Sequence, residues 1–253
     1  MTLFFSLLLR ELRSRFIGST AGWLWLIVNP LMLLAVYALV FGTIFKARAP
    51  AHLSVPFVAW LAAGLWPWLA FSEAIQRAAE SIPQHAAIIS KVPIRREFLT
   101  LSAAMAAAIL QLAGFVVVLL AIIAIGVPID PWGLPLVVFV LIVITGLALA
   151  LGLVAAVLRV LLPDFQHLLP TLLMIWFFST PILYDPALVP DAIQPLVAVN
   201  PLSLLINDLR EALFGARLWP SGGTIVVTGL TVVLGAFAHR FYRRISPYFE
   251  DFL

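Results

Sequence analysis

Side chains that could carry out chemistry are few in this sequence. It has 253 residues, of which 63% are apolar and 11% charged, and it contains no cysteine. A phosphate-binding loop of the Walker type needs glycines ahead of its lysine, and neither Lys46 nor Lys91 has them. The four histidines are scattered and lack the spacing of metal ligands. The sequence therefore predicts no catalytic residue, no metal site and no nucleotide bound by this chain.

The acidic residues give no sign of proton-coupled chemistry either, because a relay needs ionisable groups deep inside apolar spans. All twelve acids lie at or near the ends of apolar segments, where Glu73 and Arg77 form an i,i+4 pair. The net charge of +3 is small, and most of the cations lie in short loops rather than in a basic patch for nucleic acid. We therefore expect no intramembrane acid–base catalysis and no nucleic-acid partner.

One polar island, residues 84–97, stands out between two long apolar runs. It carries an apolar pair, Ile88 and Ile89, inside a cationic loop. Such a pair has no obvious use in water or in lipid, but it suits a plug that docks into a groove on another protein. The residues expected to make this contact are Gln84, Ile88, Ile89, Lys91, Arg95, Arg96 and Glu97.

The elements that position this island are apolar runs long enough to cross a bilayer. A spanning helix needs about 20 apolar residues. Charge-free windows of that size cover residues 16–45, 49–72, 98–129, 131–158, 165–184 and 218–239. The mean hydropathy is +1.11, so most of the chain is expected to lie in lipid. The sequence predicts one all-α integral membrane domain, residues 1–253, with six transmembrane helices.

The distribution of cations predicts the orientation. Six spans place both termini on the same side of the membrane. With the N-terminus inside, eleven of the fifteen Lys and Arg residues fall in inner segments, as the positive-inside rule requires. Five or seven spans would break this asymmetry, so we expect both termini to be cytoplasmic.

A helix lying in the cytoplasmic interface is predicted for residues 1–17. Its apolar residues form one stripe, and its charged residues lie opposite, which is typical of an interfacial amphipathic helix. Its charged residues are Arg10, Glu11, Arg13 and Arg15.

The outer segment 185–217 contains two further short amphipathic stretches, at 191–199 and 201–214. Asn200 suits an N-cap, Pro201 suits the first helical position and Gly215 suits the end of the longer stretch. Asp191 is a candidate cap for the shorter one. The two stretches would form a hairpin dipping into the membrane interface; a surface loop packed on the spans is the alternative.

Aromatic residues also occur inside the spans, where the usual interfacial role of Trp and Tyr does not explain them. Helical spacing places several on one stripe of the second span and others on one face of the fifth. Sugar rings can slide over such flat apolar faces without fixed hydrogen bonds, whereas packing between helices is the alternative use. The candidate channel residues are Tyr37, Trp60, Trp68, Phe71, Trp176, Phe177 and Tyr184.

The order and spacing of short motifs resemble the membrane subunit of ABC-2 type exporters of lipid-linked polysaccharides, the group that serves O-antigen, capsule and teichoic acid export. The resemblance covers nearly the whole chain, and no single motif decides it. The motifs are residues 10–15, 22–25, Asn29-Pro30, 64–68, 71–74, 87–93, 180–184, 200–202 and 247–249.

This resemblance implies a homodimer in the bacterial inner membrane that works with two copies of a separate ATPase. The partner ATPase would bind ATP and Mg²⁺, so the chain itself would be a transport subunit and not an enzyme. The resemblance also implies a coupling helix at about residues 84–92, membrane-lipid contacts and a lipid-linked polysaccharide as substrate. Gate helices are implied after the fifth span, with Asp191, Asn200, Pro201 and Arg210 as the gate residues.

The chain departs from the family in one loop and leaves two other readings open. It reads Leu162-Pro163-Asp164 where the family often has an aromatic-Arg-Asp triplet, and Arg159 is expected to serve as the local cation. An ABC exporter subunit for a drug or small lipid would share the spans and the coupling loop. A polytopic enzyme such as a lipid-linked sugar transferase would need grouped acids or histidines, and none are found.

Overall fold

The structure is a computed structural model that describes residues 2–15, 22–86 and 95–252. Every regular element in these ranges is helical, which confirms the all-α class. Short 3-10 turns occupy several connections. The helices are α1 (Thr2–Ser14), α2 (Trp25–Tyr37, continued by a π-helical segment η2 over Ala38–Ile44), α3 (Phe57–Gln84), α5 (Arg96–Ala124), α6 (Leu134–Leu161), α7 (Phe165–Ser179), α8 (Gln194–Val199), α9 (Pro201–Phe214) and α10 (Gly222–Ile245).

Five segments within the described ranges are long and apolar enough to cross a membrane. They are Trp25–Ile44, Phe57–Gln84, Arg96–Ala124, Pro131–Leu161 and Gly222–Phe249. The fifth expected span, over residues 165–184, contains only the 15-residue helix α7. At 1.5 Å per residue, α7 is about 22 Å long, which is shorter than the ~30 Å hydrocarbon layer. The structure therefore gives five long spans and one short apolar helix.

Proline explains why α7 stops early. Pro181 has no N–H to continue the helix, and its ring disfavours a helical backbone at the preceding residue. Thr180 accordingly has an extended backbone, with φ −102° and ψ 131°. The chain from 180 to 184 is non-helical, so its carbonyl groups need partners other than the helix.

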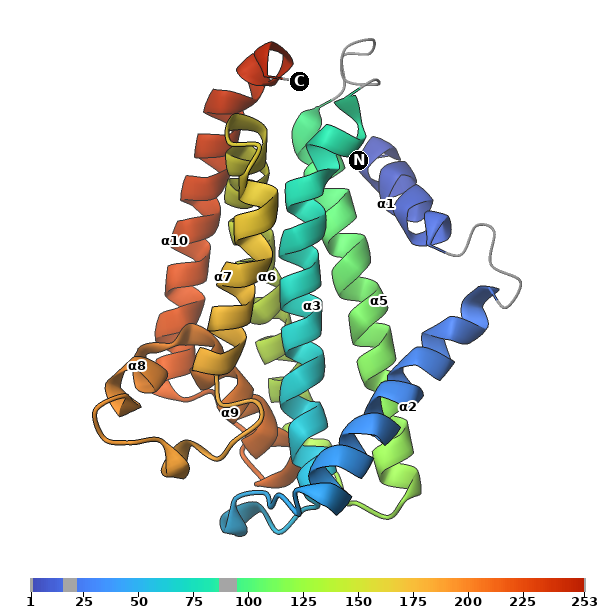
Figure 1. Ribbon diagram of the computed structural model, residues 1–253, viewed down its shortest axis with the longest axis vertical. Coiled ribbons are helices and arrows are strands. Elements are labelled where there is room, and N and C mark those ends of the chain that lie inside the picture. Colours follow the sequence, from blue (N-terminus) through green and yellow to red (C-terminus); the bar gives the residue numbers. More distant parts are fainter. Residues whose placement is uncertain (1, 16–21, 87–94, 253) are drawn as a thin grey trace.

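The centre of the bundle is α3 (Figure 1). It packs closely against α5 and α6, and α10 packs on α6. Helix α2 runs obliquely past this group and has no buried residue, whereas α1 lies against α5. The described ends of the chain, α1 and the end of α10, lie toward the same end of the bundle (Figure 1).

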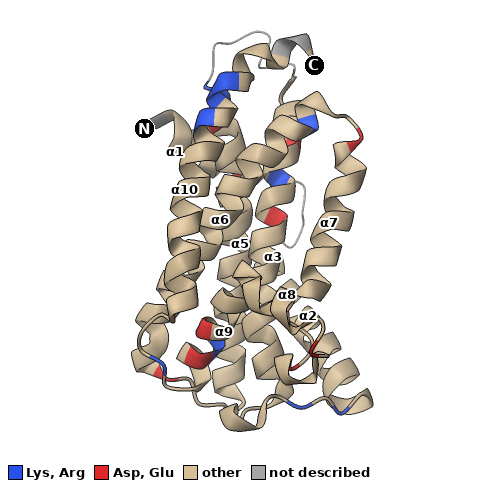
Figure 2. Cartoon of the chain, turned by 90° about the vertical axis from the view of Figure 1, so that its left-hand side faces the viewer, with Lys and Arg blue, Asp and Glu red and all other residues tan. Residues whose placement is uncertain are grey.

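Most charged residues gather toward the two ends of the bundle, although one blue and one red segment of α3 lie farther inward (Figure 2). This arrangement suits a bundle whose middle lies in lipid, because an exposed charge at the bilayer centre is costly. Glu73 departs from the sequence expectation, since α3 continues past it to Gln84 rather than ending there.

Helix α9 is inserted at one end of the bundle. Its predicted apolar stripe, including Leu205, Ile206 and Leu209, is almost completely buried against α3, α6 and α10. Asn200 caps it as predicted, because its Oδ1 accepts a hydrogen bond from the Leu202 N–H at 3.0 Å, and Gly215 follows its last residue. The shorter helix α8 has no buried residue.

The prediction that Asp191 caps the shorter helix is wrong. Helix α8 begins at Gln194, and its N-cap residue is Ile193, which provides no side-chain cap. Asp191 therefore lies too far ahead of the helix. Its Oδ1 accepts from the Gln194 side-chain amide at 3.2 Å instead.

Candidate functional site

The predicted coupling island is described only at its two flanks. Gln84 is exposed and is the last residue of α3. Ile88, Ile89 and Lys91 lie outside the described residues. Arg95 is exposed at the start of α5, with its guanidinium 5.6 Å from the centre of the Phe98 ring.

The second flank of the island is fastened to the C-terminal part of the chain. The Arg96 Nη1 donates to the carbonyl of Ser246, in the 3-10 segment η6 (Ser246–Asp251) that follows α10. Glu97 lies 3.9 Å from His239 of α10 and 3.9 Å from Arg95. The two described flanks of the predicted island thus connect to α3 through Gln84, and to α5 and the segment that follows α10 through Arg96.

The amphipathic helix α1 attaches its apolar stripe to α5. Leu7 and Leu8 are buried, and the rings of Phe4 and Phe98 pack edge to face with centroids 6.0 Å apart. Arg13 is exposed on the opposite face. The expected polar and apolar faces of this helix are therefore both present.

Charged side chains at the end of α1 reach α3. Arg10 Nη2 lies 2.6 Å from His85 Nε2, and Arg10 also lies 3.9 Å from Glu11. Arg15 Nη1 lies 2.6 Å from Glu73 Oε1, closer than the expected i,i+4 partner Arg77 at 3.7 Å. These contacts join the beginning of the chain to two levels of α3.

A second polar contact joins α3 to α6 and α7. Arg159 Nε donates to Glu80 Oε1 at 2.9 Å, and its Nη2 donates to Gln166 Oε1 at 2.7 Å. Arg159 Nη1 also donates to the Pro163 carbonyl at 3.4 Å. Arg159 thus contacts the Leu162-Pro163-Asp164 loop, for which it was the expected local cation.

The predicted channel aromatics contact one another within the protomer. Trp68 and Phe71 of α3 are 5% and 0% exposed, and α7 covers them. Ring centroids are 5.5 Å apart for Trp68 and Phe177, and 5.2 Å apart for Phe71 and Trp176. In this arrangement these rings pack as core, so a path along them stays a prediction that requires α7 to move away from α3.

The remaining predicted aromatics lie toward the hairpin end of the bundle. Tyr37 stacks on Phe41 with centroids 5.8 Å apart. Trp60 is 2% exposed. The Tyr184 hydroxyl donates to the Phe178 carbonyl at 2.9 Å. The set thus divides into an α3–α7 cluster and separate rings near the hairpin.

The most distinctive polar group is Arg210 of α9, which is 3% exposed. Its Nη1 and Nη2 donate to the carbonyls of Pro181 and Ile182, at 2.7 and 3.0 Å. Its Nε donates to the Trp60 carbonyl at 3.0 Å, and the guanidinium lies 3.5 Å from the Trp60 ring centre. Arg210 thus supplies the donors that the non-helical end of α7 lacks and ties that end to α3.

The charge of Arg210 survives this burial. Burial lowers the pKa of the guanidinium to about 9, and the nearby charge of Asp185 opposes the shift. The side chain is therefore still cationic at pH 7 and makes charge-assisted hydrogen bonds, which are stronger than neutral ones.

Glycine at position 64 makes room for this clamp. A Cβ added there would lie 2.4 Å from Arg210 Nη2, which is closer than any normal contact. The Gly64–Arg210 pair could not be recognised from sequence, because the two residues meet only when α9 packs on α3.

Asn200 forms a second tie between α7 and α9. Its Oδ1 accepts from Trp176 Nε1 at 3.0 Å, and its Nδ2 donates to Thr180 Oγ1 at 2.9 Å and to the Ser179 carbonyl at 3.2 Å. One side chain therefore caps α9 and also satisfies polar groups at the end of α7. Pro201 follows it as the first residue of α9.

Sequence reasoning missed Asp208, a carboxylate that is 1% exposed. Its oxygens accept from Arg217 Nη1 at 2.9 Å and from the Ser221 N–H at 2.7 Å, which joins α9 to the start of α10. Nearby, His52 lies 2.9 Å from Glu211 of α9. Across the described ranges, no three His, Asp or Glu side chains group closely enough to hold a metal ion.

Comparison with known proteins gives the family. The sequence matches the ABC-2 type transporter family over residues 2–214. It is similar to the O-antigen export system permease protein RfbA of Myxococcus xanthus, with 30% identity covering 92% of this chain and 88% of RfbA. It is also similar to RfbA of Klebsiella pneumoniae, with 24% identity over 88% of this chain and 87% of the relative. The polysialic acid transport protein KpsM of Escherichia coli is 25% identical over 82% of this chain and 79% of KpsM. The chain belongs to the ABC-2 type transporter family.

Proposed function

We propose that this chain is the transmembrane subunit of an ATP-driven exporter that moves a lipid-linked polysaccharide, of the O-antigen or capsular type, across the bacterial inner membrane. The observation that carries the proposal is the extent of the similarity to RfbA and KpsM, which covers at least 82% of this chain. The family match over residues 2–214 includes every helix from α1 to α9 rather than one isolated motif.

Membrane subunits of this family carry no ATPase domain and no cofactor, and a partner ABC ATPase binds the ATP. Energy must therefore enter through a contact between proteins. We assign this contact to residues 84–97 in a homodimer that binds two ATPases. The exposed positions of Gln84 and Arg95, with Arg96 fastened to the Ser246 carbonyl, support this assignment.

The proposed topology has six spans, with α7 as the fifth and both termini cytoplasmic. The non-helical residues 180–184 complete that span, and Arg210 satisfies part of their backbone, as irregular backbone at membrane depth requires. Because the chain has no cysteine, single Cys variants report each position without background. Ser246→Cys should react only from the cytoplasm and Ala187→Cys only from outside. Labelling of Ala187→Cys from the cytoplasm alone would overturn this topology.

The function is tested by deleting the gene and measuring two products. Loss of the chain should remove polysaccharide from the cell surface and leave lipid-linked polysaccharide inside the cell. Normal surface polysaccharide, together with loss of efflux of a drug or small lipid, would favour the small-substrate exporter instead.

Energy coupling is tested by the double variant Ile88→Asp and Ile89→Asp. Burying each isoleucine side chain is worth roughly 1.5–3 kcal/mol, so loss of both should weaken ATPase binding at least about 100-fold. The variant should still insert into the membrane but fail to restore export in the deletion strain. Unchanged ATPase co-purification and unchanged export would contradict the assignment of residues 84–97.

A further inference from the structure

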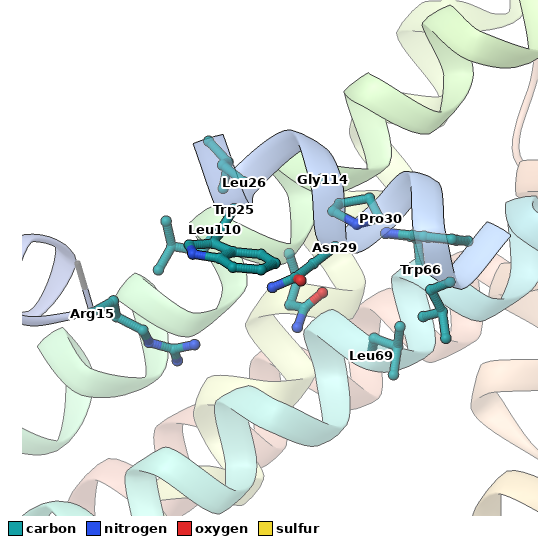
Figure 3. A pocket seen from close by; sticks show the side chains of 11 residues that line it. Arg15, Trp25, Leu26, Asn29, Pro30, Trp66, Leu69, Leu110 and Gly114 are labelled. Carbon is teal, nitrogen blue, oxygen red and sulfur yellow. The ribbon is translucent and has the colours of Figure 1, made fainter. Parts of the chain in front are cut away.

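We propose that a cavity between α2, α3 and α5 binds the phosphate group of a membrane lipid. The cavity has a volume of about 440 Å³, within the range of small-ligand sites. Its polar lining comes from Arg15, just after α1, with Trp25 and Asn29 of α2, Trp66 of α3 and Gln111 of α5 (Figure 3). The inference draws on the proposed function only for the identity of one candidate lipid.

The indole N–H of Trp66 is one hydrogen-bond donor beside this cavity. The Trp66 side chain is 1% exposed and belongs to the cavity lining, and no hydrogen bond joins its indole N–H to another residue that the structure describes. A Cβ added to Gly114 would lie 3.4 Å from Trp66 Nε1 and 2.9 Å from Pro30 Cγ. The N–H therefore points to the place where α2 crosses α5. Buried indole N–H groups normally have an acceptor, so an acceptor from a ligand would complete this site.

Helix α2 contributes a second set of unsatisfied polar groups. Asn29 lies within an apolar helix, and its amide makes no hydrogen bond to any residue that the structure describes. Pro30 lacks an N–H, so the carbonyl of Leu26 has no helical partner. Unpaired amides are costly in lipid. Figure 3 shows the polar ends of Arg15 and Asn29 turned toward the same space, where a polar ligand would satisfy them.

Arg15 brings a positive charge to the cavity lining. Behind the lining, Arg15 Nη1 lies 2.6 Å from Glu73 Oε1, and the Gln111 amide also donates to Glu73. The Arg15 guanidinium has more N–H groups than this single ion pair uses, so it can still donate to a ligand. Phosphate oxygens accept from such forks with good geometry.

The position of the cavity favours a ligand that arrives from the bilayer. None of the residues of α2 is buried, and Trp25 and Asn29, which line the cavity, are exposed in the described part of the chain. Leu33, Leu69 and Leu110 complete its lining with apolar surface suited to a hydrocarbon chain. Two kinds of lipid carry this chemistry: an anionic phospholipid, and the polyprenyl diphosphate to which the proposed polysaccharide substrate would be linked.

The test measures binding of three probes to the chain purified with its partner ATPase in neutral-lipid nanodiscs. The probes are phosphatidylglycerol, a polyprenyl diphosphate and a polyprenol without phosphate. Trp66→Phe removes the N–H and keeps most of the ring volume, whereas Arg15→Gln removes the charge. Each should weaken binding of the phosphate lipids about tenfold, the effect of one charge-assisted hydrogen bond. Trp219→Phe, at a residue that is 80% exposed and not part of the cavity lining, is the matched control and should bind like the unaltered chain.

The outcomes distinguish the two candidate lipids. They also distinguish a failure of this binding site from a failure of the proposed export function. Binding of polyprenyl diphosphate alone would make the cavity a site for the export substrate, and binding of both phosphate lipids would make it a general lipid-phosphate site. Equal binding of polyprenol, or full binding by both Trp66→Phe and Arg15→Gln, would overturn the proposal. If Trp66→Phe fails to fold, Asn29→Leu takes its place, because Asn29 is exposed and also lines the cavity. Asn29→Leu should likewise weaken binding of the phosphate lipids, and full binding would overturn the proposal. Because binding is measured without transport, a result here does not depend on which cargo is exported.

Discussion

Replacement of Arg210 by methionine tests whether one buried guanidinium holds α9 to the end of α7. Methionine keeps an unbranched apolar stem but removes every donor. The Pro181 and Ile182 carbonyls then lose their hydrogen bonds, whereas the Trp60 carbonyl lies within α3 and keeps its helical partner.

The expected loss of stability can be worked from these contacts. Each orphaned carbonyl costs about 1–3 kcal/mol, so the two cost about 2–6 kcal/mol together. Loss of the contact between the guanidinium and the Trp60 ring, 3.5 Å from its centre, adds up to about 2 kcal/mol. Removing a buried charge acts in the opposite direction, because Arg210 no longer has to be desolvated. We expect a net destabilisation of about 3 kcal/mol, or a fall in Tm of about 6–12 °C for a chain of this length.

Thermal unfolding and hydrogen exchange of the purified complex provide the assay. Protection should fall first in residues 180–184 and 201–214, because these segments meet at the guanidinium. Arg48→Met is the matched control, since Arg48 is exposed and no hydrogen bond or ion pair joins it to any other residue within the described ranges. A Tm for Arg210→Met within 1 °C of the Arg48→Met value, with unchanged exchange, would refute the clamp.

Three further substitutions test the same framework. Gly64→Ala should displace the Arg210 guanidinium and lower the Tm by several degrees. Gly229→Ala is the control, because its added Cβ meets nothing within 4 Å, and its Tm should stay the same or rise. Equal Tm values for the two variants would show that the guanidinium can move aside without loss of stability. Asp208→Asn should lower the free energy of unfolding by about 1–3 kcal/mol, measured by thermal unfolding, because a buried carboxylate with two donors is lost; no change would mean that other contacts join α9 to α10. Trp68→Ala should lower stability by about 3–5 kcal/mol through the cavity it leaves, and a variant with normal Tm and lost export would instead assign Trp68 to the substrate path.

Local signals in the sequence were sufficient to predict some of these elements. The cap at Asn200 and the end at Gly215 depend on side-chain and backbone chemistry within one turn, and the structure has both. The apolar stripe of α9 also follows from helical spacing alone. The early end of α7 also has a local signal, Pro181, which disfavours a helical backbone at Thr180. The length of the apolar window 165–184 alone does not reveal this end.

Contacts between distant segments were not predictable in the same way. Arg210 was expected near the outer gate, but its acceptors are backbone carbonyls, which every residue carries and which no sequence pattern marks as free. Glu73 was assigned to Arg77 by spacing, yet Arg15 of another segment lies closer. Helical periodicity placed Trp68 and Phe71 on one stripe of α3, but it could not show that the stripe faces α7.

The distribution of polar contacts indicates which helix moves most easily. Arg15 and Arg159 fasten α1, α6 and α7 to α3, and Arg210 fastens α9 to it. Helix α3 also extends from the Arg210 contact at Trp60 to Gln84, the start of the predicted coupling island, about 36 Å at 1.5 Å per residue. It is therefore one continuous helix between the two ends of the bundle.

Helix α2 differs from all of these elements. None of its residues is buried, and no side-chain hydrogen bond or ion pair joins residues 25–37 to another element described in the structure. Apolar contacts between helices in a bilayer are replaced by contacts with lipid tails at little cost, so a shift of α2 breaks nothing that lipid cannot restore. A shift of α2 away from α3 would widen the cavity beside Asn29 and Trp66. The Asn29 amide and the Trp66 indole N–H could then form hydrogen bonds with a polar ligand that enters it. Movement of α2 and occupation of the proposed lipid-phosphate site are therefore expected to be coupled, with the bound ligand stabilising one position of α2 against α3 and α5.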